Sequence, residues 1–504
     1  MGNDYIEASR VFHEITKHSY TSVRSSPHVL DWDIKPIPYK IYPGAASVAL
    51  PRDLNLSATP TLAALSSYVP AEFSASIETA GLTRILFCAD GLTRHKRMGA
   101  DDYHFRAAAS AGALYPIEIY VAAGAVEDLE AGLYHFSPAD LRMAGLRRGD
   151  WRGYMADAAA RGTSIRRARA VIALSAIYWR SEWKYRARAY RYCYWDAGTI
   201  LANLLAAAAA EEISAEVITA FEDPALEALL GIDGEREGMI ALVALGRSDQ
   251  PAAPSPEIGP SVPESIPLSS KEVVYHDLAR IHRESRLVTA DEVGAVSAAK
   301  LESAPSSSST SELRFETIAS EDSMGLGQTI IRRGSSRAFA QDAIAAEELA
   351  TIMAASSEHP QADFPPLTDT YLIVNAAGAL EPGAYCYNRQ ARAFEMLKAG
   401  NFRAVARYLC LEQQLGMDCS ALVVYMADLE RTLNALGNRG YGDAHLEAGI
   451  LGGRAYLAAY SLGRGATGLT FYDDDTTKFF EPHAAGKSPL LMVALGVPRS
   501  RMKS

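Results

Sequence analysis

The chain has 504 residues, of which 48% are hydrophobic and 22% are charged, a composition that excludes a disordered or fibrous protein. At about 150 residues per domain, this length predicts two or three domains. The formal net charge of −11 argues against a nucleic-acid-binding protein, because phosphate contacts need clustered cations.

The sequence shows no predicted membrane span, no secretory signal and no cysteine pattern typical of disulfides, which together predict a cytoplasmic protein. The longest apolar run, residues 200–210, is about half the length that a membrane span needs. The first 20 residues carry scattered charges and no apolar core, so we predict no secretory signal. The five cysteines form no CxxC pair, which argues against a disulfide framework and predicts that no metal is bound.

The sequence repeats itself at a long spacing. EAGLYHF (Glu130–Phe136) recurs as EPGAYCY (Glu381–Tyr387), 251 residues later, and RAYRYCYWDAG (Arg188–Gly198) recurs as RGYGDAHLEAG (Arg439–Gly449) at the same offset. Such a period exceeds that of a solenoid repeat and predicts two copies of one domain. The alternative is a chance coincidence of short Gly-, Ala- and Tyr-rich strings.

The predicted elements have a similar order in both copies. Apolar runs rich in β-branched and aromatic residues predict strands at Ile117–Gly124 and Thr370–Gly378. Long Ala- and Leu-rich runs predict helices at Trp195–Glu212 and His445–Gly463, and helices so apolar on every side are normally buried. Together they predict an α+β fold in each copy, a mostly antiparallel sheet with helices packed on it.

A change of composition separates the two copies. Gln250–Pro267 is rich in proline and Ala304–Ser311 is rich in serine, and such runs cannot bury enough apolar surface to fold alone. A helical piece is predicted near Lys271–Glu284. The predicted divisions are an N-terminal domain over residues 1–249, a linker over 250–317 and a C-terminal domain over 318–504.

Three motifs suggest a family. Tyr103–Val121, Trp183–Gly198 and Ile330–Phe339 resemble signatures of the nitroreductase-like flavin enzymes, most closely the SagB/ThcOx/McbC-type branch of FMN-dependent azoline dehydrogenases. The resemblance covers residues 27–246 and 318–504. It implies a domain that works as a homodimer with FMN in the interface, so two copies in one chain imply an intramolecular pseudo-dimer.

The two copies carry different parts of such a site. An FMN phosphate is a dianion, which arginines bind best. The counterpart stretch of the first half, Leu65–Phe73, contains no Lys or Arg. A solvated surface run is the alternative interpretation of Arg332–Arg337. The resemblance assigns phosphate and ribityl binding in the second half to Arg333, Ser335, Arg337, Arg499 and Arg501.

The loop that would cover the flavin belongs to the first half. Within Ala109–Leu114, small side chains let backbone amides approach a ligand, although a tight strand-entry loop would need the same residues. The position 251 residues after Ser110 is Gln361, where the motif is absent. The resemblance therefore implies one composite FMN site, with Ser110, Ala111 and Gly112 from the first half and the N5-proximal Thr467, Gly468 and Leu469 from the second.

Lys184 and Tyr185 are the predicted catalytic pair. In the branch that this chain resembles, a Lys-Tyr pair here is implicated as the base that removes a proton during azoline oxidation. Arg180, Arg186, Arg188 and Arg191 would form a cationic setting that lowers the lysine pKa. The alternative is an amphipathic surface helix. Thr199 stands where the branch commonly carries a histidine, which would alter hydrogen bonding near the flavin.

These features predict an FMN-dependent dehydrogenase that oxidises thiazolines or oxazolines to azoles in ribosomal peptide natural products. The expected partners are a modified peptide or small heterocycle and a cyclodehydratase, with no nucleic acid or membrane. Two alternatives remain open: a broad NAD(P)H-dependent nitro- or quinone reductase on the same fold, and a non-catalytic, flavin-free peptide-binding scaffold. The substrate peptide, the electron acceptor, further oligomerisation and a second flavin site also remain open.

Overall fold

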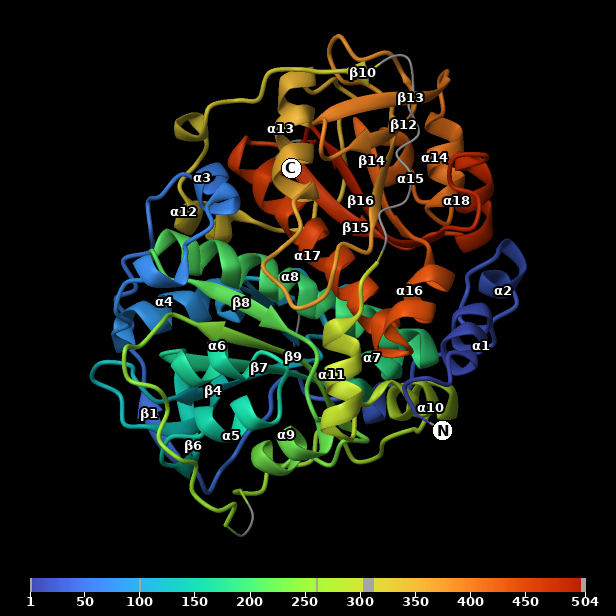
Figure 1. The fold of residues 1–504 in the computed structure, drawn as a ribbon. Coiled ribbons are helices and arrows are strands. Elements are labelled where there is room, and N and C mark those ends of the chain that lie inside the picture. Colours follow the sequence, from blue (N-terminus) through green and yellow to red (C-terminus); the bar gives the residue numbers. More distant parts are fainter. Residues whose placement is uncertain (1, 99–100, 260–261, 302–311, 500–504) are drawn as a thin grey trace.

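Two similar halves are stacked on each other along one chain (Figure 1). The computed structural model describes residues 2–98, 101–259, 262–301 and 312–499. Each half contains a seven-stranded sheet, and the two longest helices lie between the sheets at the centre of the molecule (Figure 1).

The first sheet has the strand order β1-β6-β5-β4-β7-β9-β8, and all neighbouring strands are antiparallel. Every residue of the central strands β4, β7 and β9 is buried, because helices or loops cover both faces of the sheet. Its strands are β1 (Ala46–Ala49), β4 (Ile117–Ala123), β5 (Gly132–Ser137), β6 (Arg142–Arg148), β7 (Ala170–Ile177), β8 (Ala215–Ile218) and β9 (Glu237–Leu245).

The second sheet repeats this order as β10-β13-β12-β11-β14-β16-β15, again antiparallel throughout. The predicted tandem α+β fold is therefore confirmed, strand by strand. Its strands are β10 (Glu312–Leu313), β11 (Asp369–Val374), β12 (Gly383–Asn388), β13 (Ala393–Ala399), β14 (Ala421–Ala427), β15 (Gly465–Leu469) and β16 (Ser488–Gly496).

The helices also correspond between the halves. None of those in the described ranges is long and apolar enough to cross a membrane. The paired helices are α3 (Thr61–Ser66) with α12 (Leu326–Arg332), α4 (Thr79–Asp90) with α13 (Ala346–Ser357), α5 (Arg152–Asp157) with α14 (Arg403–Leu409), α6 (Gly162–Arg167) with α15 (Gln414–Asp418), α7 (Tyr178–Tyr185) with α16 (Leu429–Leu436), α8 (Ala189–Ala210) with α17 (Arg439–Ser461) and α9 (Asp223–Leu230) with α18 (Asp473–Phe480). The others are α1 (Glu7–Ile15), α2 (Tyr20–Arg24), α10 (His276–Ser285) and α11 (Ala290–Ala298).

The segment between the sheets contains two helices, of which the sequence predicted only the first, α10. The signal for α11 is a capping box in which the Thr289 side chain accepts from the Glu292 amide while Glu292 reaches back. The domain limits at residues 249 and 317 stay predictions. The helix predicted from Trp195 begins earlier, at Ala189, because the tyrosine-rich turn before it is buried as well.

The halves touch along α8 and α17, which cross at two glycines. A Cβ atom on Gly198 would lie 2.6 Å from the backbone of Gly449, and one on Gly449 would lie 2.7 Å from the Trp195 carbonyl oxygen. Real Cβ atoms essentially never come within 3.0 Å of such atoms, so the crossing requires glycine on both helices. Since the two glycines are equivalent positions of the repeat, the pseudo-twofold axis passes close to this contact.

Mirrored polar contacts lock the halves in place. Arg188 of the first half forms a buried ion pair with Asp473 of the second (3.0 Å), and the equivalent Arg439 pairs with Asp223 in the opposite direction. Removing one partner of a buried pair typically costs about 3–5 kcal/mol, because the other charge is left uncompensated. The two halves are therefore not independent units.

We expect Gly198→Ala to destabilise the full chain by about 1–3 kcal/mol, because the added methyl group would collide with the backbone of α17. The matched control is Gly294→Ala in α11, where nothing lies within 4 Å of the new Cβ, so stability should stay equal or rise slightly. Denaturant unfolding measures both. Equal stabilities of Gly198→Ala and the wild type would show that the helices do not cross so closely.

Candidate active site

A strained turn connects β3 (Asp101–Arg106), which forms a hairpin with β2 (Leu92–Met98), to β4 of the first sheet. Gly112 has a φ of +65°, and the nearby Ala113 and Tyr115 also have positive φ angles, of 55° and 50°. Residues with side chains avoid this region at a cost on the order of 1 kcal/mol each. Such strain persists only where surrounding contacts impose it, and it is typical of functional sites.

Side chains of helix α8 fix this turn by hydrogen bonds. The Asp196 carboxylate accepts hydrogen bonds from the Ser110 hydroxyl (2.6 Å) and the Ala111 amide (2.9 Å). Thr199 donates to the Ala109 carbonyl oxygen (2.6 Å). Although Thr199 stands where the branch commonly carries a histidine, it therefore still helps to fix the conformation of this loop. Burial raises the pKa of Asp196 to about 7, although the two hydrogen bonds oppose the shift.

Lys184 and Tyr185, at the end of α7, lie over Gly112. From the point where a residue-112 side chain would begin, the Tyr185 hydroxyl is 2.6 Å away and the Lys184 ammonium 3.0 Å. Burial, then the charges of Arg337 and Lys35, lower the pKa of the half-buried Lys184. Burial raises the pKa of Tyr185 well above its usual value, so this phenol stays protonated and can donate a hydrogen bond.

The cations around Lys184 are not the expected ones. Arg180 is paired with Glu118, and Arg188 and Arg191 are both paired with Asp473. These arginines are buried, and the paired carboxylates neutralise their charges. They therefore stabilise the core and the interface between the halves. The charges that act on Lys184 come instead from Lys35 and, across the interface, from Arg337.

The alternative of a solvated amphipathic helix does not fit this segment. Trp179, Arg180 and Trp183 of α7 are all at most 4% exposed. The Trp183 indole donates to the Asp31 carbonyl oxygen (2.6 Å) and packs edge-on against Trp32 (5.1 Å between ring centroids). The N-terminal segment around Trp32 therefore covers α7, and it carries Lys35 close to Lys184.

Arg333 reaches from the second half to the stem of the strained turn. Its Nε donates to the Ala107 carbonyl oxygen (2.7 Å), and its Nη2 donates to those of Arg106 (2.8 Å) and Ala108 (3.0 Å). In the described residues Nη1 has no protein partner. The predicted phosphate-binding arginine thus also ties the two halves together, which sequence reasoning missed.

Two further predicted residues of the second half, Ser335 and Gly468, contact Tyr456 of α17. The Tyr456 hydroxyl is 3.4 Å from the Ser335 hydroxyl and accepts a hydrogen bond from the Gly468 amide in β15. The Arg499 amide donates to the Ala338 carbonyl oxygen (3.1 Å), which brings the C-terminal segment to the same loop. Arg501 lies outside the described residues.

The equivalent site on the other side of the pseudo-twofold axis is closed. There the Val217 amide donates to the Gln361 carbonyl oxygen (2.8 Å) and the Asp363 amide to that of Val217 (3.1 Å). The Asp363 carboxylate also accepts from the amides of Thr219 (2.8 Å) and Ala220 (3.0 Å). No such bond joins residues 109–113 to 466–471 within the described chain, so these two segments are not tied together as their counterparts are.

Comparison with known proteins identifies the family. The model of the nitroreductase family matches residues 72–247 and again 330–497. A putative nitroreductase of Methanocaldococcus jannaschii is 30% identical over 166 residues, which are 33% of this chain and 79% of that protein. The chain therefore belongs to the nitroreductase family and carries two copies of its domain. Proteins of this family generally bind the flavin FMN.

Solved structures share the fold. A putative nitroreductase from Anabaena variabilis superposes with a TM-score of 0.75 at 24% identity, over 98% of this chain and 99% of its own. An E. coli microcin synthetase complex with truncated pro-MccB17 bound matches 49% of this chain and 93% of its own at 16% identity. Its TM-score of 0.32 is too low to carry a functional argument.

Arg186, directly after Tyr185, has φ 55° and ψ −145°, a conformation that glycine alone adopts without strain. Its counterpart in the second half is Gly437, with φ 67° and ψ −158°. We expect Arg186→Gly to stabilise the chain by about 1 kcal/mol, because the strain disappears.

The control is Arg283→Gly, at an exposed helical position of α10, which should lose about 1 kcal/mol. Denaturant midpoints compare the two variants. A loss of stability in Arg186→Gly equal to that of the control would contradict the strained conformation.

Proposed function

We propose that this nitroreductase-family protein is an FMN-dependent dehydrogenase of the SagB type, which oxidises a thiazoline or oxazoline ring of a modified peptide to the aromatic azole. The observation that carries the proposal is the position of Lys184. This half-buried amine of the first half lies over the strained Gly112 turn, beside Arg337 of the second half, and its pKa is lowered.

The charges of the site fit a phosphate group. Arg333, Arg337 and Arg499 have no carboxylate within 4.0 Å in the described residues, although the chain is acidic overall. Arg333 is buried, whereas Arg337 and Arg499 are exposed, and two other buried arginines, Arg106 and Arg439, are each paired with an aspartate. Three arginines without a carboxylate partner around one loop would offer a dianion such as the FMN phosphate several charge-assisted hydrogen bonds.

Two segments that face each other across the interface, one from each half, would suit a planar ring. Ser110–Gly112 would cover it from the first half, since small residues let the backbone come close, and Thr467–Leu469 would hold its other edge from the second half. Ser335 would add a hydroxyl donor near the phosphate. These two segments belong to opposite halves, which is the arrangement that a dimer interface gives in this family.

The chemistry divides between cofactor and protein. FMN, when bound, would supply the two-electron acceptor for the hydride that the azoline ring loses. The neutral amine of Lys184 accepts the proton that the same ring loses, because burial and two neighbouring cations favour its uncharged form. Tyr185 keeps its proton and orients the amine or the substrate by donating a hydrogen bond. An azoline arises by cyclodehydration, so a cyclodehydratase is the expected upstream partner.

Lys184→Ala should abolish azole formation while the protein still binds FMN, since the side chain removes a proton and holds no phosphate. Product mass after incubation with a thiazoline peptide measures the first effect, and the flavin absorbance of the desalted protein measures the second. Azole formation at the wild-type rate by the variant would place the base elsewhere.

The pH dependence of the rate of azole formation gives a second prediction, which compares the wild type with Lys35→Ala. The wild-type rate should rise with pH as Lys184 loses its proton, and the midpoint should lie below 10.5, the ordinary lysine pKa. Lys35→Ala removes a like charge that lowers this pKa, so its profile should move to higher pH with an unchanged plateau. An unshifted profile would show that Lys184 is not the titrating base.

The second candidate function is a broad NAD(P)H-dependent nitro- or quinone reductase. The observation that favours it is that the Methanocaldococcus and Anabaena proteins are both described as putative nitroreductases. Rapid NADPH consumption with a nitroaromatic acceptor, together with no turnover of azoline peptides, would favour the reductase.

A further inference from the structure

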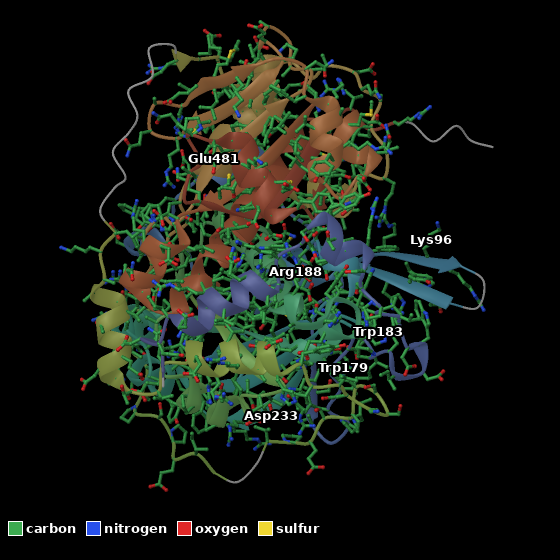
Figure 2. All side chains as sticks on the ribbon, turned by 90° about the vertical axis from the view of Figure 1, so that its right-hand side faces the viewer. Lys96, Trp179, Trp183, Arg188, Asp233 and Glu481 are labelled. Atoms are coloured by element: carbon green, nitrogen blue, oxygen red, sulfur yellow. The ribbon has the colours of Figure 1, made fainter. Side chains whose placement is uncertain are left out.

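The first half carries a β-hairpin that the second half lacks. It consists of β2 (Leu92–Met98) and β3 (Asp101–Arg106), inserted between α4 and the strained turn, whereas α13 leads to β11 without such strands. In the described chain these two strands pair only with each other. Figure 2 shows the hairpin projecting from the body, with Lys96 labelled beside it.

The base of this hairpin reaches the phosphate loop of the other half. β2 packs against α12, the helix that precedes Arg333. Both terminal nitrogens of Arg94 lie 3.8 Å from the point where a residue-334 side chain would begin, and the Tyr460 hydroxyl lies 3.7 Å from the same point. The Arg94 guanidinium also stacks on Phe105, 4.5 Å from the ring centroid, which fixes its direction. Because residue 334 is glycine, the space between these groups stays open.

The charge of Arg94 is not balanced by the protein. No carboxylate lies within 4.0 Å of it in the described residues, whereas His95, next along the strand, contacts Asp102 at 3.1 Å. Burial chiefly, and the nearby Arg94 charge in smaller part, lower the pKa of Arg333. Arg94 is exposed and Arg333 is buried, so water screens part of the repulsion between the two guanidinium groups. An anion bound between them would be attracted by both charges.

We propose that Arg94 is a phosphate-binding residue for FMN, supplied by the first half to the loop of Arg333 and Arg337 in the second. The proposal rests on the proposed FMN-dependent function and adds a cation from an element that only one copy possesses. The base of the hairpin then contributes to the affinity for the cofactor. The group bound there is a phosphomonoester dianion, and the lack of a side chain at Gly334 leaves space for it.

The test is a fluorescence titration of the flavin-free full chain with FMN and, separately, with riboflavin, which lacks the phosphate. Arg94→Ala should raise the FMN Kd about 10- to 100-fold, as expected for a lost charge-assisted hydrogen bond, and leave the riboflavin Kd unchanged. Arg94→Lys should restore part of the affinity. The matched control is Arg97→Ala, three residues along the same strand and on its opposite face, which should bind FMN like the wild type.

The outcomes separate the two proposals. If the wild type binds FMN and Arg94→Ala binds it equally well, the role of Arg94 is overturned while the proposed function stands. Equal weakening of FMN and riboflavin would also overturn it, because the residue would then act through the fold. If the wild type binds no FMN, the proposed function and this inference are both wrong.

Discussion

The contact between the backbones of Gly198 and Gly449 sets the distance between the two halves. With any side chain at the crossing, α8 and α17 would stand further apart, and every contact across the interface would lengthen. Arg333 reaches the carbonyl oxygens of the opposite half only because this separation is small. The mirrored ion pairs of Arg188 and Arg439 then fix the orientation of the halves around the same point.

A duplicated domain with two equivalent sites can lose different parts from each copy. Here the first half has Glu72 and no cation in the stretch that follows α3, whereas the second half has its arginines after α12. Conversely, the second half lacks the small-residue turn, and its Gln361–Asp363 segment is hydrogen-bonded to Val217. The site without these closing hydrogen bonds is therefore the one that combines the turn of the first half with the arginines of the second.

Sequence reasoning succeeded where the signal is local. The 251-residue repeat, the buried strands and the two apolar helices all follow from patterns within short segments, and the structure confirms the tandem fold. It failed for charges, because a run of arginines does not reveal its partners: Arg180, Arg188 and Arg191 find carboxylates at residues 118 and 473. Arg94 and Lys35 were missed for the same reason, since only folding brings them to the site.

We infer that one composite flavin site spans both halves. The FMN content of the full chain, after saturation with excess cofactor and desalting, tests this by flavin absorbance against protein concentration and by native mass spectrometry. We expect one FMN per chain. Two FMN per chain would contradict it, because the site that Val217 and Asp363 close would then have to open and bind a phosphate without arginines.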